Sequence, residues 1–149
     1  MSQPSLFGAQ SGGSAVANID GGARGNPGPA GYGVRIECAD GTLVELKEAL
    51  GVATNNVAEY RGLIAALAWA AQHGVNRLHL RSDSLLLVKQ MCGEYRVKNQ
   101  GLKPLWDEAR RLVHQIGDVR FEHVRRELNA DADRLANEAM NEAATRGGG

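Results

Sequence analysis

The sequence is poor in cysteine and has no long hydrophobic run. Its 149 residues include two cysteines, Cys38 and Cys92, which are far apart and form no C-x-x-C motif, so neither a disulfide framework nor a zinc site is expected. No apolar run approaches the ~20 residues that a membrane-spanning helix needs. The N-terminus lacks both the basic and the apolar region of a secretory signal. These absences favour a cytoplasmic protein without a membrane partner.

The sequence also lacks a net charge, because 17 Lys and Arg residues balance 17 Asp and Glu residues. This balance argues against a protein that is held on DNA, RNA or an anionic membrane by bulk charge. The distribution is nevertheless uneven, since residues 77–126 contain eleven basic and six acidic side chains. That local excess is compatible with an ordinary solvated surface or with a surface that contacts phosphates.

The length and the hydrophobic content predict a single domain. With 43% hydrophobic residues in 149, the chain can bury a real core. Residues 1–14 and the Gly-rich residues 145–149 lack hydrophobic periodicity, which is typical of flexible tails. The domain is therefore expected to span residues 15–144, and a monomer is the simplest expectation for this size.

Hydrophobic periodicity predicts three strands, a helix, a strand, two helices, a strand and a final helix. The expected strands are 15–20, 32–38, 43–49, 77–82 and 119–124. The expected helices run from residue 54 or 55 to 74, from 84 to 91, from 104 to 117 and from 129 to 143, with Asn129 as the N-cap of the last. Helices that alternate with strands in the second half indicate an α/β fold, in which helices cover a mixed sheet.

Four acidic residues stand in unusual places. Asp20 ends the first expected strand and Asp83 follows the fourth, while Glu59 and Asp133 lie at the edges of the apolar stripes of two helices. Taken singly, each has an ordinary interpretation as a turn residue or as an ion-paired surface acid. Taken together, four carboxylates on elements that could converge would repel one another without a cation. Oxygen ligands of this kind favour Mg²⁺ or Mn²⁺.

The same residues carry a resemblance to a known family. Four motifs occur in order: DGGARGNPGPAGYG (20–33), ATNNVAEYRGLIAAL (53–67), SDS (82–84) and NADADRLANEAM (129–140). Over residues 15–144 the chain resembles the type 1 ribonuclease H (ribonuclease HI) family. The resemblance implies a five-stranded mixed sheet of order 3-2-1-4-5 that is flanked by helices.

The resemblance also implies an activity, namely endonucleolytic hydrolysis of the RNA strand of an RNA–DNA hybrid, leaving 3′-hydroxyl and 5′-phosphate ends. Asp20, Glu59, Asp83 and Asp133 match the catalytic carboxylates of the family. In that family they hold two Mg²⁺ ions, for which Mn²⁺ can substitute, and this agrees with the chemistry of two-metal phosphate hydrolysis.

Substrate contacts follow from the resemblance as well. Asn26, Asn55, Asn56 and Ser84 match positions that contact the hybrid near the cut, and Thr54 matches a position that holds a phosphate of the DNA strand. Amides suit this task because they both donate to and accept from a 2′-hydroxyl. Local roles are also open, since Asn26 can form a turn before a proline and Thr54 or Asn55 can cap a helix.

Two departures from the family pattern concern His123 and the segment after Cys92. His123 resembles the loop histidine that assists proton transfer or product release, but its neighbours lack the usual glycine, so a place in the strand is an alternative. Residues 93–104 are too short for the basic handle that grips the hybrid in some members, which leaves Arg96, Lys98 and Lys103 as candidates for backbone contact. Weak, salt-sensitive binding of the hybrid is therefore expected.

Two rival functions remain to be weighed. A nucleotide-binding module is disfavoured because Gly25-x-x-Gly28 does not fit G-x-G-x-x-G and no Walker-type motif exists. A non-catalytic nucleic-acid- or protein-binding module with the ribonuclease H fold is the alternative that stays open. Neutral charge favours that module, whereas the presence of all four acids favours the enzyme.

Overall fold

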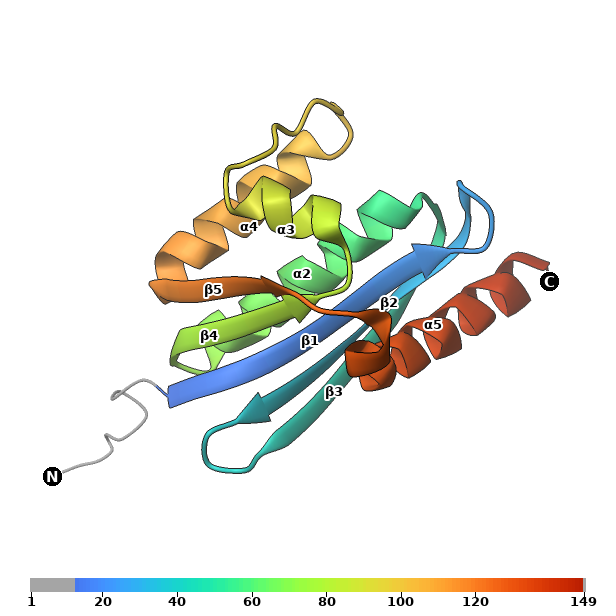
Figure 1. The fold of residues 1–149 in the computed structure, drawn as a ribbon. Helices are drawn as coiled ribbons and strands as arrows, with labels where there is room; N and C mark the ends of the chain where they lie inside the picture. Colours follow the sequence, from blue (N-terminus) through green and yellow to red (C-terminus); the bar gives the residue numbers. More distant parts are fainter. Residues whose placement is uncertain (1–12, 149) are drawn as a thin grey trace, which may run out of the picture.

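The computed structural model describes residues 13–148 and places them in one five-stranded sheet with helices on both faces (Figure 1). The strands are β1 (Gly13–Ala23), β2 (Gly28–Cys38), β3 (Leu43–Ala53), β4 (Val75–Ser82) and β5 (Asp118–His123). Their order in the sheet is β3-β2-β1-β4-β5. The first three strands are antiparallel neighbours, and β4 and β5 add to β1 in parallel. The expected mixed sheet and its strand order are confirmed.

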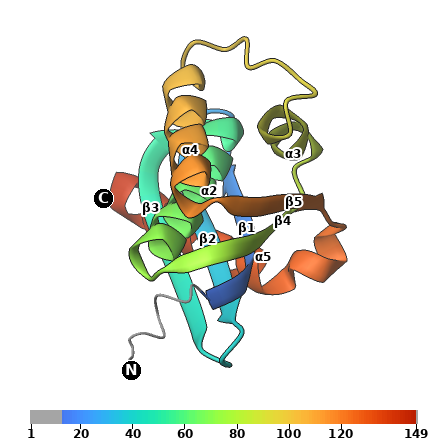
Figure 2. The same ribbon diagram turned by 90° about the vertical axis from the view of Figure 1, so that its left-hand side faces the viewer.

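Helices cover the two faces of the sheet unequally. They are α2 (Asn55–Gln72), α3 (Leu85–Met91), α4 (Lys103–Ile116) and α5 (Ala130–Gly148), with a 3₁₀ turn, η1 (Arg126–Asn129), before α5. Helix α2 packs on β1 and β2 and is backed by α4, whereas α5 packs on β1, β2 and β3 from the other side (Figures 1 and 2). Successive side chains of β2 point to opposite faces of the sheet, so β2 contributes residues to both helix layers. No described helix is long and apolar enough to cross a membrane.

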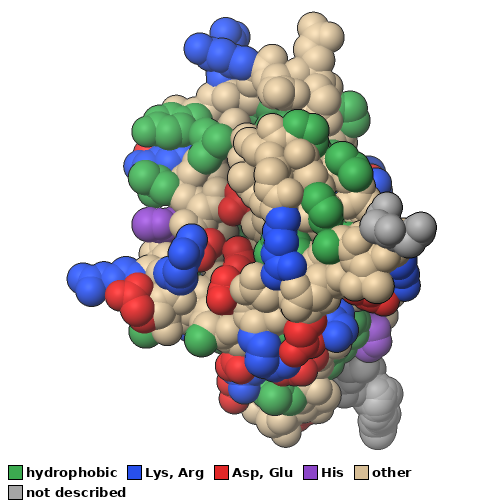
Figure 3. Space-filling view, turned by 90° about the vertical axis from the view of Figure 1, so that its right-hand side faces the viewer, with side chains coloured by type: hydrophobic (Ala, Val, Ile, Leu, Met, Phe, Trp, Pro, Cys, Tyr) green, Lys and Arg blue, Asp and Glu red, His purple; other side chains and the backbone are tan. Residues whose placement is uncertain are grey.

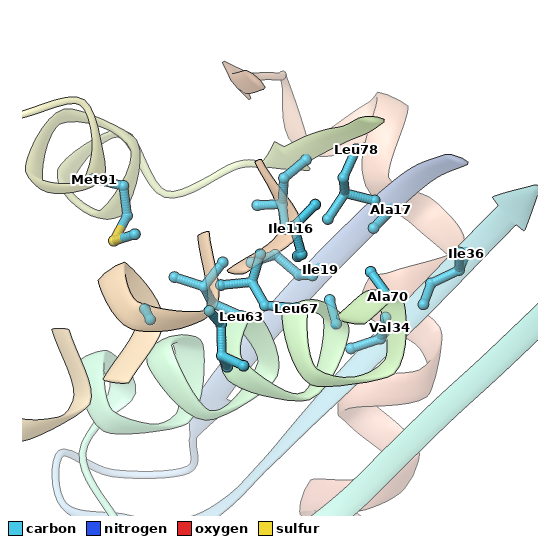
Figure 4. Packing of buried hydrophobic residues seen from close by; sticks show 14 of the residues in the cluster. Ala17, Ile19, Val34, Ile36, Leu63, Leu67, Ala70, Leu78, Met91 and Ile116 are labelled. Atoms are coloured by element: carbon cyan, nitrogen blue, oxygen red, sulfur yellow. The ribbon is translucent and has the colours of Figure 1, made fainter. Parts of the chain in front are cut away.

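The core lies between α2 and the sheet (Figure 4). Ile19 of β1, Leu78 of β4 and Leu67 of α2 are among the fully buried side chains that fill it. Small residues on the helix, such as Ala66 and Ala70, are also fully buried. Since alanine adds little bulk, α2 can approach β1 closely, and this brings the N-terminal end of α2 against the end of β1.

Several boundaries differ from the sequence expectation. Strand β1 starts at Gly13 and continues through Asp20 to Ala23, and α5 continues past residue 144 to Gly148. Gly21 and Gly22, which follow Asp20, pair with Tyr32 and Gly31 of β2 and extend the hairpin beyond the expected end of the strand. The expected N-terminal tail lies outside the described residues except for 13 and 14, which belong to β1.

Candidate active site

The sheet topology brings two of the four acids together. The parallel pairing of β1 with β4 ends at the pair Ile19 and Ser82, and the next residue in each strand direction is an aspartate, Asp20 or Asp83. Parallel strands that end their pairing at one place present their following residues side by side. The same point of the sheet receives Glu59, which lies one turn into α2.

Three carboxylates converge at this point. One oxygen each from Asp20, Glu59 and Asp83 lies within 4.8 Å of the others. Asp133 of α5 is outside this group of three, but its side chain hydrogen-bonds Asp20 and raises the pKa of that carboxyl. All four side chains face one hollow. Its other lining residues are Gly21, Gly22, Ala23, Asn55, Asn56, His123, Val124, Arg125, Arg126, Glu127, Asn137 and Met140.

Figure 3 shows the charge pattern on this side of the molecule. Asp and Glu side chains gather in a recess, and Lys or Arg side chains stand on either side of it. A recess of negative charge with basic walls attracts cations to its floor and polyanions to its rim.

Burial and mutual repulsion raise the pKa values of the clustered acids. Burial, followed by the charges of Asp83 and Asp133, raises the pKa of Asp20 to about 8. Burial raises the pKa of Glu59 to about 7, although the Ser84 hydroxyl lowers it in part by hydrogen bonding. The pKa of Asp83 is also raised by burial, against the lowering effect of the Arg126 charge. Such a cluster is unfavourable when fully ionised and alone.

The donor set fits a divalent cation. Three carboxylates with oxygens within 4.8 Å of one another form a hard, anionic ligand set of the kind that Mg²⁺ and Mn²⁺ prefer. A bound cation would also remove the repulsion that raises the pKa values of Asp20 and Glu59.

Glycines on β1 and β2 let the helices that carry Glu59 and Asp133 come close. A Cβ on Gly21 would lie 2.5 Å from the carbonyl oxygen of Ala58, next to Glu59 in α2. A Cβ on Gly33 would lie 2.5 Å from the carbonyl oxygen of Ala132, next to Asp133 in α5. Both distances are too short for any side chain, so glycine at these positions sets the distance between the acids.

Asn129 holds α5 in place in a way that the sequence did not indicate. Asn129 directly precedes α5, at the position where an N-cap is expected, and its side chain is 1% exposed. Its Nδ2 donates to the Ile19 carbonyl (2.8 Å), and its Oδ1 accepts from Asn18 Nδ2 (2.9 Å). Asn129 therefore connects the start of α5 to β1 one residue before Asp20. The sequence offers only one polar residue as a sign of this role, because the hydrogen-bond partners of Asn129 lie 110 and 111 positions away.

Of the residues matched to substrate contacts, Asn55 and Asn56 line the hollow, whereas Asn26, Thr54 and Ser84 are not among its lining residues. Thr54 is the N-cap of α2, accepting from Val57 N at 3.2 Å. Asn26 Oδ1 accepts from Asn55 N (3.0 Å), while Asn55 Oδ1 accepts from Ala23 N (2.7 Å). These two bonds join the β1–β2 hairpin to the start of α2.

Asn56 and Ser84 complete this set. Asn56 is exposed in the first turn of α2 and lines the hollow. Ser84 caps α3 by accepting from Leu87 N at 3.2 Å, and its hydroxyl also hydrogen-bonds Glu59. Ser84 thus contacts one of the three clustered acids directly.

His123 belongs to the strand rather than to a loop. It is the last residue of β5, and its Nε2 lies 3.3 Å from the Asp83 carbonyl oxygen at the edge of the hollow. Arg126 stands beside it with Nε 4.0 Å from Asp83 Oδ2, and its side chain is 82% exposed. The exposed arginine is thus free to exchange its carboxylate for another anion at little cost.

The raised pKa values predict that cation binding strengthens with pH. A carboxyl whose pKa is higher in the folded protein than in the unfolded chain destabilises the metal-free fold as pH rises between the two values, here from about 4 to about 8. Ionisation over the same range creates the ligands for the cation. We expect Mg²⁺ to raise Tm more at about pH 8 than at about pH 5.5, measured by scanning fluorimetry against chelator. An Mg²⁺ effect that shrinks with pH would contradict this.

The comparisons with known proteins agree with this geometry. A family model described as "Reverse transcriptase-like" matches residues 18–139. The bifunctional protein Rv2228c of Mycobacterium tuberculosis is 50% identical over 87% of this chain and 36% of its own length. The structure of its N-terminal RNase H domain has a TM-score of 0.86 at 48% identity, covering 90% of this chain and 98% of that one.

Two further relatives are similar over most of the chain. Ribonuclease HI of Halobacterium salinarum is 44% identical over 89% of this chain and 67% of its own length. LC11-RNase H1, solved in complex with RNA/DNA hybrid, has a TM-score of 0.81 at 41% identity, covering 87% of this chain and 98% of that one.

A mixed sheet of order β3-β2-β1-β4-β5 with acids from β1, α2, the end of β4 and α5 defines a ribonuclease H-like domain. The matched relatives narrow this class of domain to one family. The chain belongs to the type 1 ribonuclease H family. It spans about a third of the length of the first mycobacterial relatives that it matches.

Proposed function

We propose that this domain is an endonuclease that hydrolyses the RNA strand of RNA–DNA hybrids and leaves 3′-hydroxyl and 5′-phosphate ends. The observation that supports it most is the convergence of Asp20, Glu59 and Asp83 within 4.8 Å on a ribonuclease H fold. The complex of LC11-RNase H1 with RNA/DNA hybrid, a structure 41% identical to this chain, supports the choice of substrate. One chain supplies all four acids, so the proposed working unit is a monomer.

In this proposal Asp20, Glu59, Asp83 and Asp133 hold two Mg²⁺ ions. When bound, the ions supply activation of the attacking water and neutralisation of charge on the leaving 3′-oxygen. The protein holds the four carboxylates in place by burial and by close helix packing, so little reorganisation is needed when the substrate binds.

The amides and hydroxyls around the hollow would position the hybrid. Asn26 and Asn55 use their Oδ1 atoms inside the protein, which leaves their Nδ2 donors for 2′-hydroxyl or phosphate oxygens. Asn56 has a full amide available at the surface. Thr54 accepts from a backbone N–H group, and a hydroxyl that accepts can still donate. The Ser84 hydroxyl accepts from Leu87 N and hydrogen-bonds Glu59, which leaves a lone pair that can accept from a 2′-hydroxyl. Both the local and the substrate roles can therefore coexist in one side chain.

His123 would assist proton transfer or product release from the edge of the hollow. Its ring lies beside the Asp83 backbone, so one ring nitrogen is oriented by the protein and the other is available to substrate or water. Arg126 and Arg125 line the same edge and would face phosphate oxygens.

The activity is tested by incubating the protein with labelled RNA–DNA hybrid, duplex RNA and single-stranded RNA, each with Mg²⁺, Mn²⁺ or chelator. We expect cleavage of the RNA strand of the hybrid, dependence on the cation, and products with 3′-hydroxyl ends. Equal cleavage of all three substrates would refute the hybrid preference. Activity in chelator would refute the metal mechanism, and binding without any cleavage would support the non-catalytic module.

Without a basic handle, the affinity for the hybrid is expected to depend on a few charged contacts. Residues 92–102, between α3 and α4, form a loop without a helix and contribute Arg96 and Lys98, while Lys103 begins α4. The salt slope increases with the number of phosphates that are neutralised, so a few contacts give weak binding that still depends on salt through counterion release. We expect the Kd for a hybrid, measured by fluorescence anisotropy in chelator, to weaken roughly ten- to a hundredfold between about 50 and about 200 mM salt. A Kd that stays constant over this range would exclude the electrostatic binding mode.

A further inference from the structure

The β1–β2 hairpin carries an arginine whose charge is not neutralised. Arg24 directly follows β1 and is exposed. Within residues 13–148 it forms no ion pair, in contrast to Arg35, Arg126 and Arg134, which each lie within 4.0 Å of a carboxylate. An exposed arginine without a carboxylate is ordinary when its side chain moves freely, but this one is held.

Neutral oxygens orient the guanidinium of Arg24. Its Nη1 donates to Asn141 Oδ1, and its Nη2 lies 3.4 Å from Asn137 Oδ1 and 3.5 Å from the Asn137 carbonyl oxygen. Asn137 is itself oriented, because its Nδ2 donates to the Asp133 carbonyl at 2.9 Å. Amide and carbonyl acceptors fix the direction of the side chain without cancelling its charge, and five N–H donors leave some for a further partner.

The backbone beneath Arg24 is fixed as well. Arg24 N donates to the Pro29 carbonyl at 2.9 Å across the hairpin, and Ala23 is tied to Asn55 of α2. A Cβ on Gly28 would lie 2.1 Å from the Arg24 carbonyl oxygen, so the hairpin closes tightly there. The guanidinium is therefore held by α5 and the backbone that carries it by α2 and β2, which limits the entropy lost when it binds a ligand.

The position of this arginine matches a polyanion that enters the acidic hollow. Ala23 and Asn137, its chain neighbour and its contact, both line the hollow. The four carboxylates repel a phosphodiester, and Arg125 and Arg126 offset this only along the edge formed by the end of β5 and η1. Resting on the proposed function, we infer that Arg24 binds a backbone phosphate of the nucleic acid next to the one being cut, on the α5 side of the hollow. A planar guanidinium suits two phosphate oxygens.

Arg24→Gln tests this contact, with Arg134→Gln as the matched control. Arg134 is an exposed arginine on α5 whose charge is neutralised by Glu45 and Glu138. We expect Arg24→Gln to raise KM for the hybrid roughly tenfold while kcat stays within about twofold. The slope of log Kd against log salt should become shallower by about one. Arg24→Lys should keep the wild-type slope and recover part of the affinity, and Arg134→Gln should change neither quantity.

The Arg24→Gln experiment distinguishes a structural role of Arg24 from a role in binding nucleic acid. If Arg24→Gln lowers Tm but leaves KM and the salt slope unchanged, Arg24 only ties the hairpin to α5 and the inference is wrong. An equal change in slope for Arg134→Gln would also overturn it. The slope is measured by binding in chelator, so a wild-type protein that binds hybrid without cutting it refutes the proposed activity and not the Arg24 contact.

Discussion

Asp20→Asn is expected to abolish cleavage and, at the same time, to stabilise the metal-free protein. Asp20 is the acid whose pKa is raised to about 8 by burial and by the charges of Asp83 and Asp133. Asparagine keeps the shape and removes the charge, so it removes both a proposed cation ligand and the repulsion. We expect the cleavage rate to fall at least about a thousandfold. The Tm in chelator should rise by a few degrees at about pH 8 and by less at about pH 5.

The combination of the two effects separates a functional acid from a structural one. Asp118→Asn is the matched control, because Asp118 is a half-exposed acid at the start of β5 that pairs with Arg77 at 3.4 Å. Its loss should leave the cleavage rate within about twofold and lower the Tm slightly or not at all. If Asp20→Asn instead lowers the Tm in chelator, the acids stabilise the fold and the repulsion argument fails. If it cleaves at the wild-type rate, Asp20 holds no essential cation.

Two kinds of sequence signal predict this fold: hydrophobic periodicity and a resemblance to a family. Hydrophobic periodicity located the strands and helices because each buries one face, and that signal is local. The order of the strands came from the family resemblance, since periodicity does not say which strands pair. The position of Asp20 was predicted at the end of a strand, whereas β1 continues for three residues to Ala23. Of the two glycines that follow Asp20, Gly21 allows the close approach of α2, because a Cβ there would lie 2.5 Å from the Ala58 carbonyl oxygen.

Asn129 and Arg24 show what local patterns leave out. An asparagine before a helix is typical of an N-cap, yet the Asn129 side chain binds Asn18 and Ile19 of β1. Arg24 was one more residue of a matched motif, and its orientation depends on Asn137 and Asn141, more than a hundred positions later. Such roles are set by tertiary partners. A single sequence without aligned relatives carries no sign of which distant residue completes a hydrogen bond.

Gly33→Ala is expected to destabilise the whole fold. A Cβ at this position would lie 2.5 Å from both the Ala132 carbonyl oxygen and the Leu135 Cβ, and 2.6 Å from Ala136 N. Two of these atoms belong to the helix backbone, so no rotamer change relieves the overlap and α5 must move away from β2. Overpacking of this kind costs typically 1–3 kcal/mol and occasionally more. We expect a loss of about 3 kcal/mol, which lowers Tm by roughly 6 to 12 °C.

The displacement of α5 should also affect the active site. Asp133 follows Ala132, whose carbonyl oxygen the added methyl contacts, so cleavage by Gly33→Ala should fall well below wild type even at a temperature where the variant is folded. Gly13→Ala is the control, because a Cβ at Gly13 meets nothing within 4 Å in residues 13–148. Its Tm and activity should equal those of the wild type. Denaturant unfolding and initial cleavage rates measure the two effects. A Gly33→Ala variant with unchanged stability would show that α5 can shift at no cost, and that close packing on β2 does not set the position of Asp133.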